Sequence, residues 1–437
     1  MKRVCGFAVT MLLVAAPAVV RAQAPAAAEA EMPRIRISDP NRDLFRIALP
    51  NVSGEGGLAT EALEIERRAF EVMGLFNLLN PTSFPPDLQR EGVAAFNATN
   101  WSQVGAQGVV KLSVARGGGG VTLDGRLYQV GRGDAAVLSR SYRGDSLRPL
   151  VYTFVNEVIG QLTGKPGPFG SRVAFATVGA RSEINSVGAD GSEARVLTKM
   201  GSESLLPAYS PTGAQIAFTS YLRGTPDLWI VSANGGRARA ISKRPGMNSG
   251  AVFTRDGREL IVTLSFEGNA ELYRIAADDG KVIDRLTRSQ FIDMSATLSP
   301  SGNEVAFVSD RGGSAQIYTM PASGGQPRRL TFQGSNNTTP RYSPRTDKLQ
   351  LAFTGRDERG AFDIFIYDFQ TQKIERITQN QGSNQSPDWS PDGRLLVYSS
   401  SRGGLFVMNI ETRKETQIYR GRVNSPSWGP VQGAARP

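Results

Sequence analysis

The segment SPSGNEVAFVSD, residues 299–310, contains the two features on which the fold of this chain depends. Its first part, Ser299-Pro300-Ser301-Gly302, is a turn sequence, because proline presets the first central backbone angle and glycine accepts the left-handed one. Its second part, Val305-Ala306-Phe307, is a short apolar strand. The pair predicts a hairpin-type turn that leads into a buried strand.

The apolar strand recurs along the chain at a nearly constant spacing. Its central residues are Ala174, Ala217, Val262, Ala306, Ala352 and Val397, which lie 43, 45, 44, 46 and 45 residues apart. Each repeat contains about four strands, and a period of about 45 residues with four strands is typical of a β-propeller blade. The chain is therefore expected to contain a propeller.

The two ends of this array complement each other. The last turn, Trp428-Gly429-Pro430, has no apolar strand after it, and the first apolar strand, at Val173, has no such turn before it. A strand over 424–428 is expected to join the sheet that begins at Arg172, because this closes the ring and hides two open sheet edges. The sequence thus predicts an all-β six-bladed β-propeller over residues 171–430.

Residues 32–165 lack the repeat and predict a small α/β N-terminal domain. Apolar residues at helical spacing predict helices over 58–73 and 147–162. Strands are expected at 35–37, 44–49, 108–114, 121–130 and 136–141. The sequence Lys165-Pro166-Gly167-Pro168 should end the second helix and form a short, stiff linker to the propeller.

The first 22 residues have the pattern of a secretory signal peptide, with Lys2 and Arg3 before an apolar run and small residues up to Ala22. An uncleaved membrane anchor is the alternative, but the run is short and lacks a stop-transfer pattern. The alanine-rich residues 23–31 are expected to be a mobile N-terminal segment.

Composition excludes several kinds of chemistry. The sequence contains no histidine, and its one cysteine, Cys5, lies in the signal peptide. Ser-His-Asp and Cys-His catalysis and histidine metal sites are therefore excluded, so no catalytic residue, cofactor or metal is predicted. The formal charge of +10 is spread through loops rather than along one helix, and nucleic-acid binding is not expected of an exported protein.

The polar segments that precede the turns are expected to be loops and contain the candidate binding residues. They are rich in amides, differ between blades and emerge on one face of the ring, which in repeat folds is commonly the binding surface. Their alternative role as solvated connections stays open. The residues are Met247, Asn248, Ser249, Gly250, Asp293, Met294, Ser295, Asn336, Asn337, Thr338, Asn384, Gln385 and Ser386.

The order of signal peptide, α/β domain and six blades resembles the TolB family, the periplasmic component of the Tol–Pal system. The similarity covers nearly the whole mature chain. The residues that carry it are Gly74-Leu75-Phe76-Asn77 with Pro81, 101–105 and Val109-Val110, then Asn156-Glu157-Val158 with Leu162-Thr163-Gly164, and Gly167-Pro168-Phe169 running into Arg172-Val173-Ala174-Phe175.

The resemblance implies a non-enzymatic periplasmic scaffold that supports outer-membrane integrity, outer-membrane constriction during cell division and protein import. It implies that the peptidoglycan-associated lipoprotein Pal binds the segments named above, foremost 247–250 and 293–295. The chain departs from the family there, with Met247 and Met294 in place of more polar residues.

The resemblance also implies that the inner-membrane protein TolA binds the N-terminal segment as an added strand. Its counterpart here is Arg34-Ile35-Arg36-Ile37, whose side chains alternate as strand addition requires. An edge strand packed on its own domain is equally compatible. Other Tol proteins are further candidate partners, and a monomer that is not inserted in the membrane is expected.

Two other functions are known for propeller folds. A propeller peptidase needs a hydrolase domain with a nucleophile elbow, and neither is found in this sequence. A propeller lyase or sugar-binding protein would use the central channel, and convergent carboxylates or aromatic residues along that channel would support it.

Overall fold

The computed structural model describes residues 44–179, 181–356 and 360–432, which all belong to one compact unit. The signal peptide 1–22, the segment 23–31 and the strand expected at 35–37 lie outside the described residues.

An α/β region forms the first part of the described chain. Its mixed sheet has the strand order β3-β1-β4-β5-β6, with β2 paired to β4. Strand β1 runs parallel to β3 and β4, whereas β4, β5 and β6 form an antiparallel meander. The sheet therefore contains both parallel and antiparallel pairing. The strands are β1 Phe45–Ala48, β2 Ser53–Gly54, β3 Phe76–Leu78, β4 Gly108–Gly117, β5 Gly120–Gln129 and β6 Ala136–Gly144.

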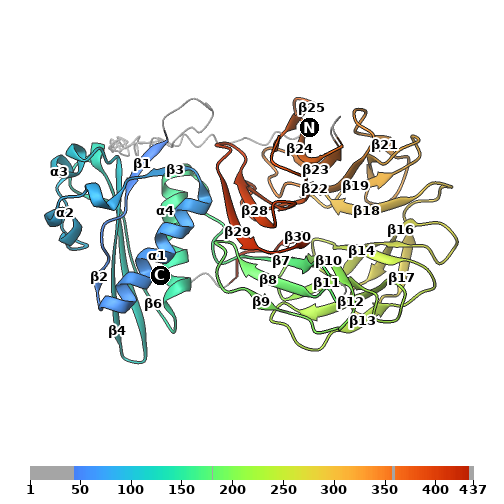
Figure 1. Cartoon of the computed structure of the whole chain (residues 1–437), viewed down its shortest axis with the longest axis horizontal. Helices are drawn as coiled ribbons and strands as arrows, with labels where there is room; N and C mark the ends of the chain where they lie inside the picture. Colours follow the sequence, from blue (N-terminus) through green and yellow to red (C-terminus); the bar gives the residue numbers. More distant parts are fainter. Residues whose placement is uncertain (1–43, 180, 357–359, 433–437) are drawn as a thin grey trace, which may run out of the picture. The chain divides into compact units, whose positions relative to one another are not determined.

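Two long helices pack on each other and on this sheet (Figure 1). Helix α1 spans Gly56–Met73 and helix α4 spans Leu147–Thr163, which confirms both predicted helices. Each ends at a glycine in the left-handed conformation, Gly74 with φ 65° and Gly164 with φ 83°. The short elements were not predicted: η1 Pro81–Ser83, α2 Pro86–Arg90, α3 Ala98–Gln103 and η2 Val130–Arg132.

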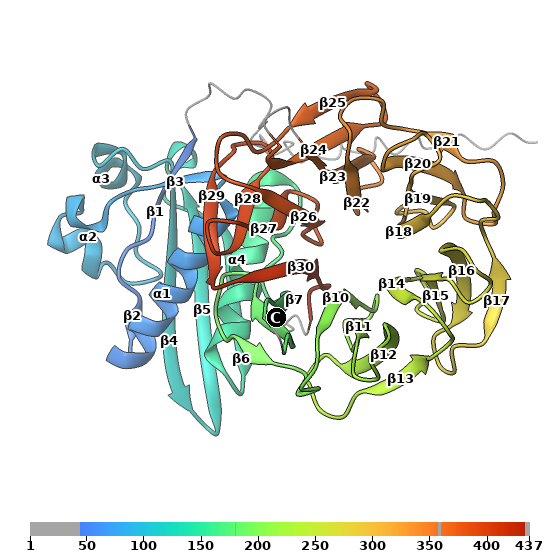
Figure 2. The same ribbon diagram turned by 45° about the vertical axis from the view of Figure 1, so that its right-hand side comes forward.

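Six four-stranded antiparallel sheets follow, arranged as the blades of a propeller (Figure 2). We number the blades from the sheet that contains β7. Blade 1 consists of β30 Val423–Trp428, β7 Arg172–Thr177, β8 Ile184–Gly188 and β9 Arg195–Val196; blade 2 of β10 Ser204–Tyr209, β11 Gln215–Ser220, β12 Asp227–Ser232 and β13 Arg239–Ser242; blade 3 of β14 Asn248–Phe253, β15 Glu259–Leu264, β16 Glu271–Ala276 and β17 Val282–Arg285. Blade 4 consists of β18 Asp293–Leu298, β19 Glu304–Ser309, β20 Gln316–Pro321 and β21 Arg328–Arg329; blade 5 of β22 Asn337–Tyr342, β23 Gln350–Arg356, β24 Phe362–Asp368 and β25 Lys373–Arg376; blade 6 of β26 Asn384–Trp389, β27 Leu395–Ser400, β28 Gly404–Asn409 and β29 Glu415–Arg420.

The ring closes as the sequence predicts. Strand β30, the last in the chain, pairs antiparallel with β7, the first strand of the propeller, with Trp428 opposite Val173 and Asn424 opposite Ala176. Because the two strands come from opposite ends of the propeller, the sheet of blade 1 holds the ring shut, and β7 is paired on both sides, with β30 and β8.

The strand order gives the propeller two distinct faces. The inner strands β10, β14, β18, β22, β26 and β30 surround the ring axis and run side by side from blade to blade (Figure 2). On one face, here called the turn face, the inner strands β10, β14, β18, β22 and β26 end in the turns that lead to the second strands, and β30, the last strand, also ends there. On the opposite face, here called the loop face, the inner strands begin and the hairpins between second and third strands lie.

Candidate functional site

The predicted binding segments contain the starts of four inner strands, so their assignment as loops was wrong. Strands β14, β18, β22 and β26 begin at Asn248, Asp293, Asn337 and Asn384. These four side chains are almost fully buried, with exposed fractions of 0%, 0%, 4% and 0%. A buried amide or carboxylate needs a hydrogen-bond partner, and three of the four have several.

The bonds of these first residues hold neighbouring parts of the ring together. Asn248 accepts a hydrogen bond of 2.5 Å from the Ser242 hydroxyl and donates to the carbonyl of Pro226 in the preceding blade. Asp293 accepts two bonds of 2.8 and 2.7 Å from one nitrogen of Arg311. Asn337 donates to the side-chain oxygen of Gln316 in blade 4 at 2.9 Å. These contacts give the first residues a structural role.

The two residues that follow in each inner strand are more accessible. The second and third residues of the inner strands are half-buried, except Gln385, which is exposed. The third residue of every inner strand has a positive φ. The pairing register shifts at this point in all six inner strands, which is a β-bulge. The left-handed residues are Leu206, Gly250, Ser295, Thr339, Ser386 and Ser425.

The predicted site residues therefore divide into two groups. Within the predicted segments, the side chains that remain accessible are Met247, Ser249, Gly250, Met294, Ser295, Asn336, Thr338, Gln385 and Ser386. They lie at or near the start of inner strands on the loop face, and their role in binding remains a prediction. The segment Arg34-Ile35-Arg36-Ile37 lies outside the described residues.

Exposed apolar side chains gather on the same face. Tyr221 and Leu222, in the hairpin after β11, are 38% and 47% exposed, and Phe291 and Ile292, just before β18, are 36% and 42% exposed. Phe332, in the connection from β21 to β22, is 71% exposed. Exposed aromatic and aliphatic side chains of this kind are typical of surfaces that bind proteins. Sequence reasoning missed all five, because apolar residues in loops give no periodic signal.

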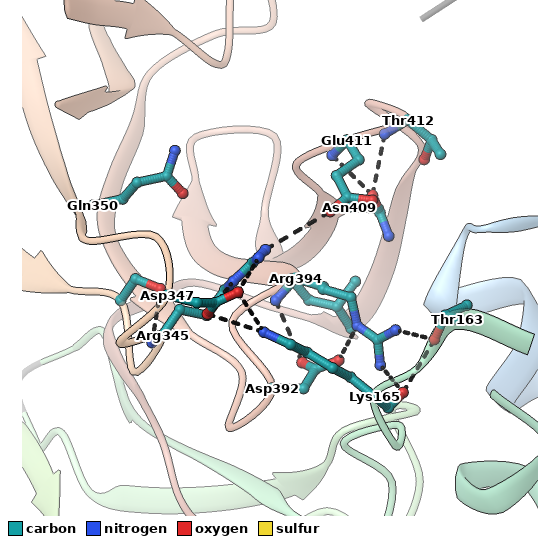
Figure 3. A network of polar contacts seen from close by, with 12 residues as sticks. Thr163, Lys165, Arg345, Asp347, Gln350, Asp392, Arg394, Asn409, Glu411 and Thr412 are labelled. Carbon is teal, nitrogen blue, oxygen red and sulfur yellow. Dashed lines mark hydrogen bonds and ion pairs between the residues drawn. The ribbon is translucent and has the colours of Figure 1, made fainter. Parts of the chain in front are cut away.

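The α/β region contacts the turn face at blades 1, 5 and 6, and Figure 3 shows the contacts with blades 5 and 6. Arg394, in the turn between β26 and β27, donates to the Thr163 hydroxyl at 2.7 Å and to the carbonyls of Lys165 and Pro166 at 3.0 and 2.6 Å. Asp392 accepts a bond of 2.6 Å from the same guanidinium. The sequence predicted a linker at 165–168 but not its anchorage to blade 6.

Further bonds join the two regions on this face. The Lys165 ammonium lies 2.9 Å from Asp347, which also pairs with Arg345 (Figure 3). The hydrogen bonds from Arg345 and Lys165 hold the pKa of the Asp347 carboxyl well below its usual range. Asn409 donates to the Met73 carbonyl at 2.8 Å, at the end of α1. Among the described residues, the hydrogen bonds of the α/β region reach the turn face, whereas Phe291, Ile292 and Phe332 on the loop face are exposed.

The inner strands do not present a cluster of carboxylates along the ring axis. All six strands are described, and their acidic residues are Asp293 and Asp388. Asp388 accepts hydrogen bonds from the backbone of Trp389 and Trp428, at 3.0 and 2.7 Å, and burial raises the pKa of its carboxyl. Both acids are thus engaged in structural bonds, which gives no support to a channel enzyme. Among the described residues, no group of three or more histidine, cysteine or acidic side chains is arranged to hold a metal.

Within the described chain, no helix has the length and apolar character needed to span a membrane.

Comparisons with known proteins agree in both regions. Residues 159–432 match the family model of the TolB beta propeller domain, and residues 33–136 match that of the TolB amino-terminal domain. The Tol-Pal system protein TolB of Anaeromyxobacter dehalogenans is 37% identical over 473 residues, which cover 95% of this chain and 97% of that protein. The protein of the same name from Myxococcus xanthus is 37% identical over 424 residues, which cover 94% of this chain and 97% of that protein.

A solved structure has the same fold. The crystal structure of TolB from Acinetobacter baumannii superposes with a TM-score of 0.80 at 24% identity and covers 89% of this chain and 97% of that one. At this identity the likeness concerns the fold.

Proposed function

Because this chain belongs to the TolB family, we propose that it is a periplasmic, non-enzymatic scaffold of the Tol–Pal system that binds Pal through the loop face and TolA through residues 34–37. In this role it would support outer-membrane integrity, constriction during cell division and protein import. The residues proposed for Pal binding are the accessible members of the predicted segments, together with the exposed apolar side chains beside them.

The observation that carries the proposal is the contrast in how the two propeller faces are occupied. The turn face is bonded to the chain's own α/β region through Arg394 and Asn409. The loop face presents Phe291, Ile292 and Phe332 to solvent. Burying such side chains against a partner releases about 25 cal/mol per Å² of apolar surface, so this face has both the access and the driving force for protein binding.

The first experiment measures binding of Pal from the same organism to the mature chain, residues 23–437, and to a form that lacks residues 23–39. We expect both forms to bind Pal with the same affinity, because the loop face is intact in each. We expect only the longer form to bind TolA, because residues 34–37 supply the added strand. Absence of Pal binding by either form at micromolar concentration contradicts the proposal.

A matched pair of isoleucines tests which surface is used. Ile292 on the loop face is 42% exposed, and Ile283 on the outer strand β17 is 50% exposed. Ile292→Lys should weaken Pal binding at least tenfold, since a charge would have to be desolvated in the interface. Ile283→Lys should leave the affinity unchanged. Equal effects of the two substitutions would place the interface elsewhere.

A further inference from the structure

A cleft opens on the loop face between blades 4 and 5. Its volume is about 400 Å³, and its lining comes from the connection into β22 and from strands of blade 5. The floor contains Phe353 and Phe365, whose rings stack at 5.5 Å between centroids with an angle of 19° between their planes. Arg356 and Arg376 lie at its edge. A pocket of this size with an aromatic floor and a few polar groups is suited to one or two side chains.

Blade 4 shows what the corresponding space holds elsewhere in the ring. There the guanidinium of Arg311 lies over the rings of Phe307 and Tyr318, 5.6 and 5.2 Å from their centroids, and is bonded to Asp293. By strand register, the counterparts of Asp293, Phe307 and Tyr318 in blade 5 are Asn337, Phe353 and Phe365, which all line the cleft. The exposed Arg356 lies instead over the ring of Phe362, at 6.0 Å. The guanidinium of Arg376 lies 6.0 Å from the centroid of the Phe365 ring, so the rings of blade 5 are partly covered, but both line the cleft and can be contacted there by a side chain from another molecule.

The connection beside the cleft also departs from the repeat. After each fourth strand of blades 1 to 5 comes an apolar residue, then serine or threonine, then an exposed residue. This exposed residue is Lys199, Lys243, Arg288, Phe332 and Gln379 in turn. Only blade 4 has an apolar residue here, and Phe332 is 71% exposed. One side of its ring lies against Arg329, 5.0 Å from the centroid, which holds the ring in place next to Gln333 at the cleft.

Among the described residues that line the cleft, the charged side chains are both arginines, Arg356 and Arg376. Arg376 forms an ion pair with the buried Asp363, so its charge is balanced. Arg356 is exposed and adds a positive charge at the edge. A partner that brings a negative charge would therefore be favoured over a basic one, and the exposed amides of Gln333 and Gln379 can bond to its backbone.

We propose that this cleft, with Phe332 at its edge, is an anchor pocket for an aromatic side chain carried on an acidic segment of the protein that binds the loop face. The aromatic ring packs on Phe353 and Phe365 beside Phe332, and a neighbouring carboxylate pairs with Arg356. Buried aromatic anchors surrounded by polar contacts commonly dominate the energy of protein interfaces. The inference rests on the proposed function for its partner, which is Pal.

The first test compares Pal binding to the mature chain and to single variants by calorimetry. Phe332→Gln introduces the residue type that the next blade has at this position, and Arg356→Glu reverses the charge at the edge. Each should lower the affinity at least tenfold, while Ile283→Gln on the outer strand should not change it. Because Phe332 and Arg356 are exposed, their replacement should leave the thermal unfolding midpoint nearly unchanged. If Pal binds the wild type and both variants equally, the pocket is not an anchor, although the scaffold function stands.

The second test examines the pocket without Pal. The probe is the capped tripeptide acetyl-Glu-Phe-Glu-amide, with acetyl-Lys-Phe-Lys-amide as control, followed by saturation-transfer NMR on the mature chain. With the wild-type chain, the phenylalanine ring of the acidic peptide should show saturation transfer, and that of the basic peptide should show none. Phe332→Gln and Arg356→Glu should each abolish the transfer to the acidic peptide. If Pal does not bind the wild type, the scaffold function fails, and the peptide test alone decides whether the pocket is an anchor site. Saturation transfer to the acidic peptide that depends on Phe332 supports the pocket. Absence of this saturation transfer overturns it.

Discussion

Arg394 on the turn face is 4% exposed, whereas Phe332 on the loop face is 71% exposed. Both occupy segments that connect strands of the same repeating blade. The arginine is bonded to the α/β region of its own chain, and the phenylalanine faces solvent. A charged side chain that is buried with full hydrogen bonding stabilises the native chain, whereas an exposed apolar one gains free energy only when another molecule covers it. Arg394 on the turn face thus serves contacts within the chain, whereas the exposed Phe332 on the loop face fits the proposed contact with a partner.

The largest effect is expected from removing the bonds on the turn face. Arg394→Ala deletes three donors to Thr163, Lys165 and Pro166 and leaves Asp392, whose side chain is 8% exposed, without its ion-pair partner. Because an unpaired buried charge is costly, the free energy of unfolding should fall by about 3–5 kcal/mol. Urea unfolding followed by tryptophan fluorescence measures this loss.

The control for this experiment lies on the loop face. Arg288 is exposed and donates one bond to the Arg285 carbonyl, so Arg288→Ala should change the free energy of unfolding by less than about 0.5 kcal/mol. Similar losses for both arginines would remove the distinction between the two faces that the structure indicates.

Two adjacent residues test the comparison within the loop face itself. Asp293 is 0% exposed and bonded to Arg311, whereas its neighbour Met294 is half-buried. Asp293→Ala should lower the free energy of unfolding by about 2–3 kcal/mol, because Arg311 loses its buried partner. Met294→Ala should have a smaller effect on stability but weaken Pal binding. If instead Met294→Ala unfolds the protein and Asp293→Ala does not, the division into structural first residues and accessible second residues is wrong.

Sequence periodicity predicted the parts of the fold that depend on local pattern. The six apolar second strands, the two helices and the closure of β30 onto β7 all follow from spacing and turn residues. The other five inner strands did not, because sequences such as Asn384-Gln385-Ser386 combine amides and a serine that favour loops. They form strands because the second strand of each blade and the neighbouring inner strands supply pairing and burial, which no local window contains.

The candidate site was less predictable than the fold. The pre-turn segments do start on one face of the ring, and binding by that face remains a prediction. Exposure cannot be read from composition, so the buried Asn248 and the exposed Phe291 were not distinguished. Phe332 did leave a signal, since the repeat places Lys, Arg or Gln at the other four positions. The contact of Arg394 with Thr163 joins residues 231 apart in sequence and leaves no signal in a single chain.

The smallest change in the free energy of unfolding is expected in the α/β region, which contacts the turn face. Glu66 on α1 is 0% exposed, both of its carboxylate oxygens lack a hydrogen-bond partner among the described residues, and burial raises its pKa well above the usual value. A carboxyl whose folded pKa is raised binds more protons in the folded state, so its contribution to stability falls as pH rises above about 4.5. Glu66→Met, which removes the buried polar group, should therefore raise the free energy of unfolding at pH 7 by about 1–2 kcal/mol.

Glu66→Gln separates ionisation from polarity at this position. The amide cannot ionise but still buries an unpaired polar group, so this variant should lose the decline in stability between pH 5 and pH 7 without the full gain of Glu66→Met. Denaturant titrations of the three proteins at several pH values measure both effects. If the wild type and Glu66→Gln show the same pH dependence, the carboxyl is solvated or paired in the folded chain.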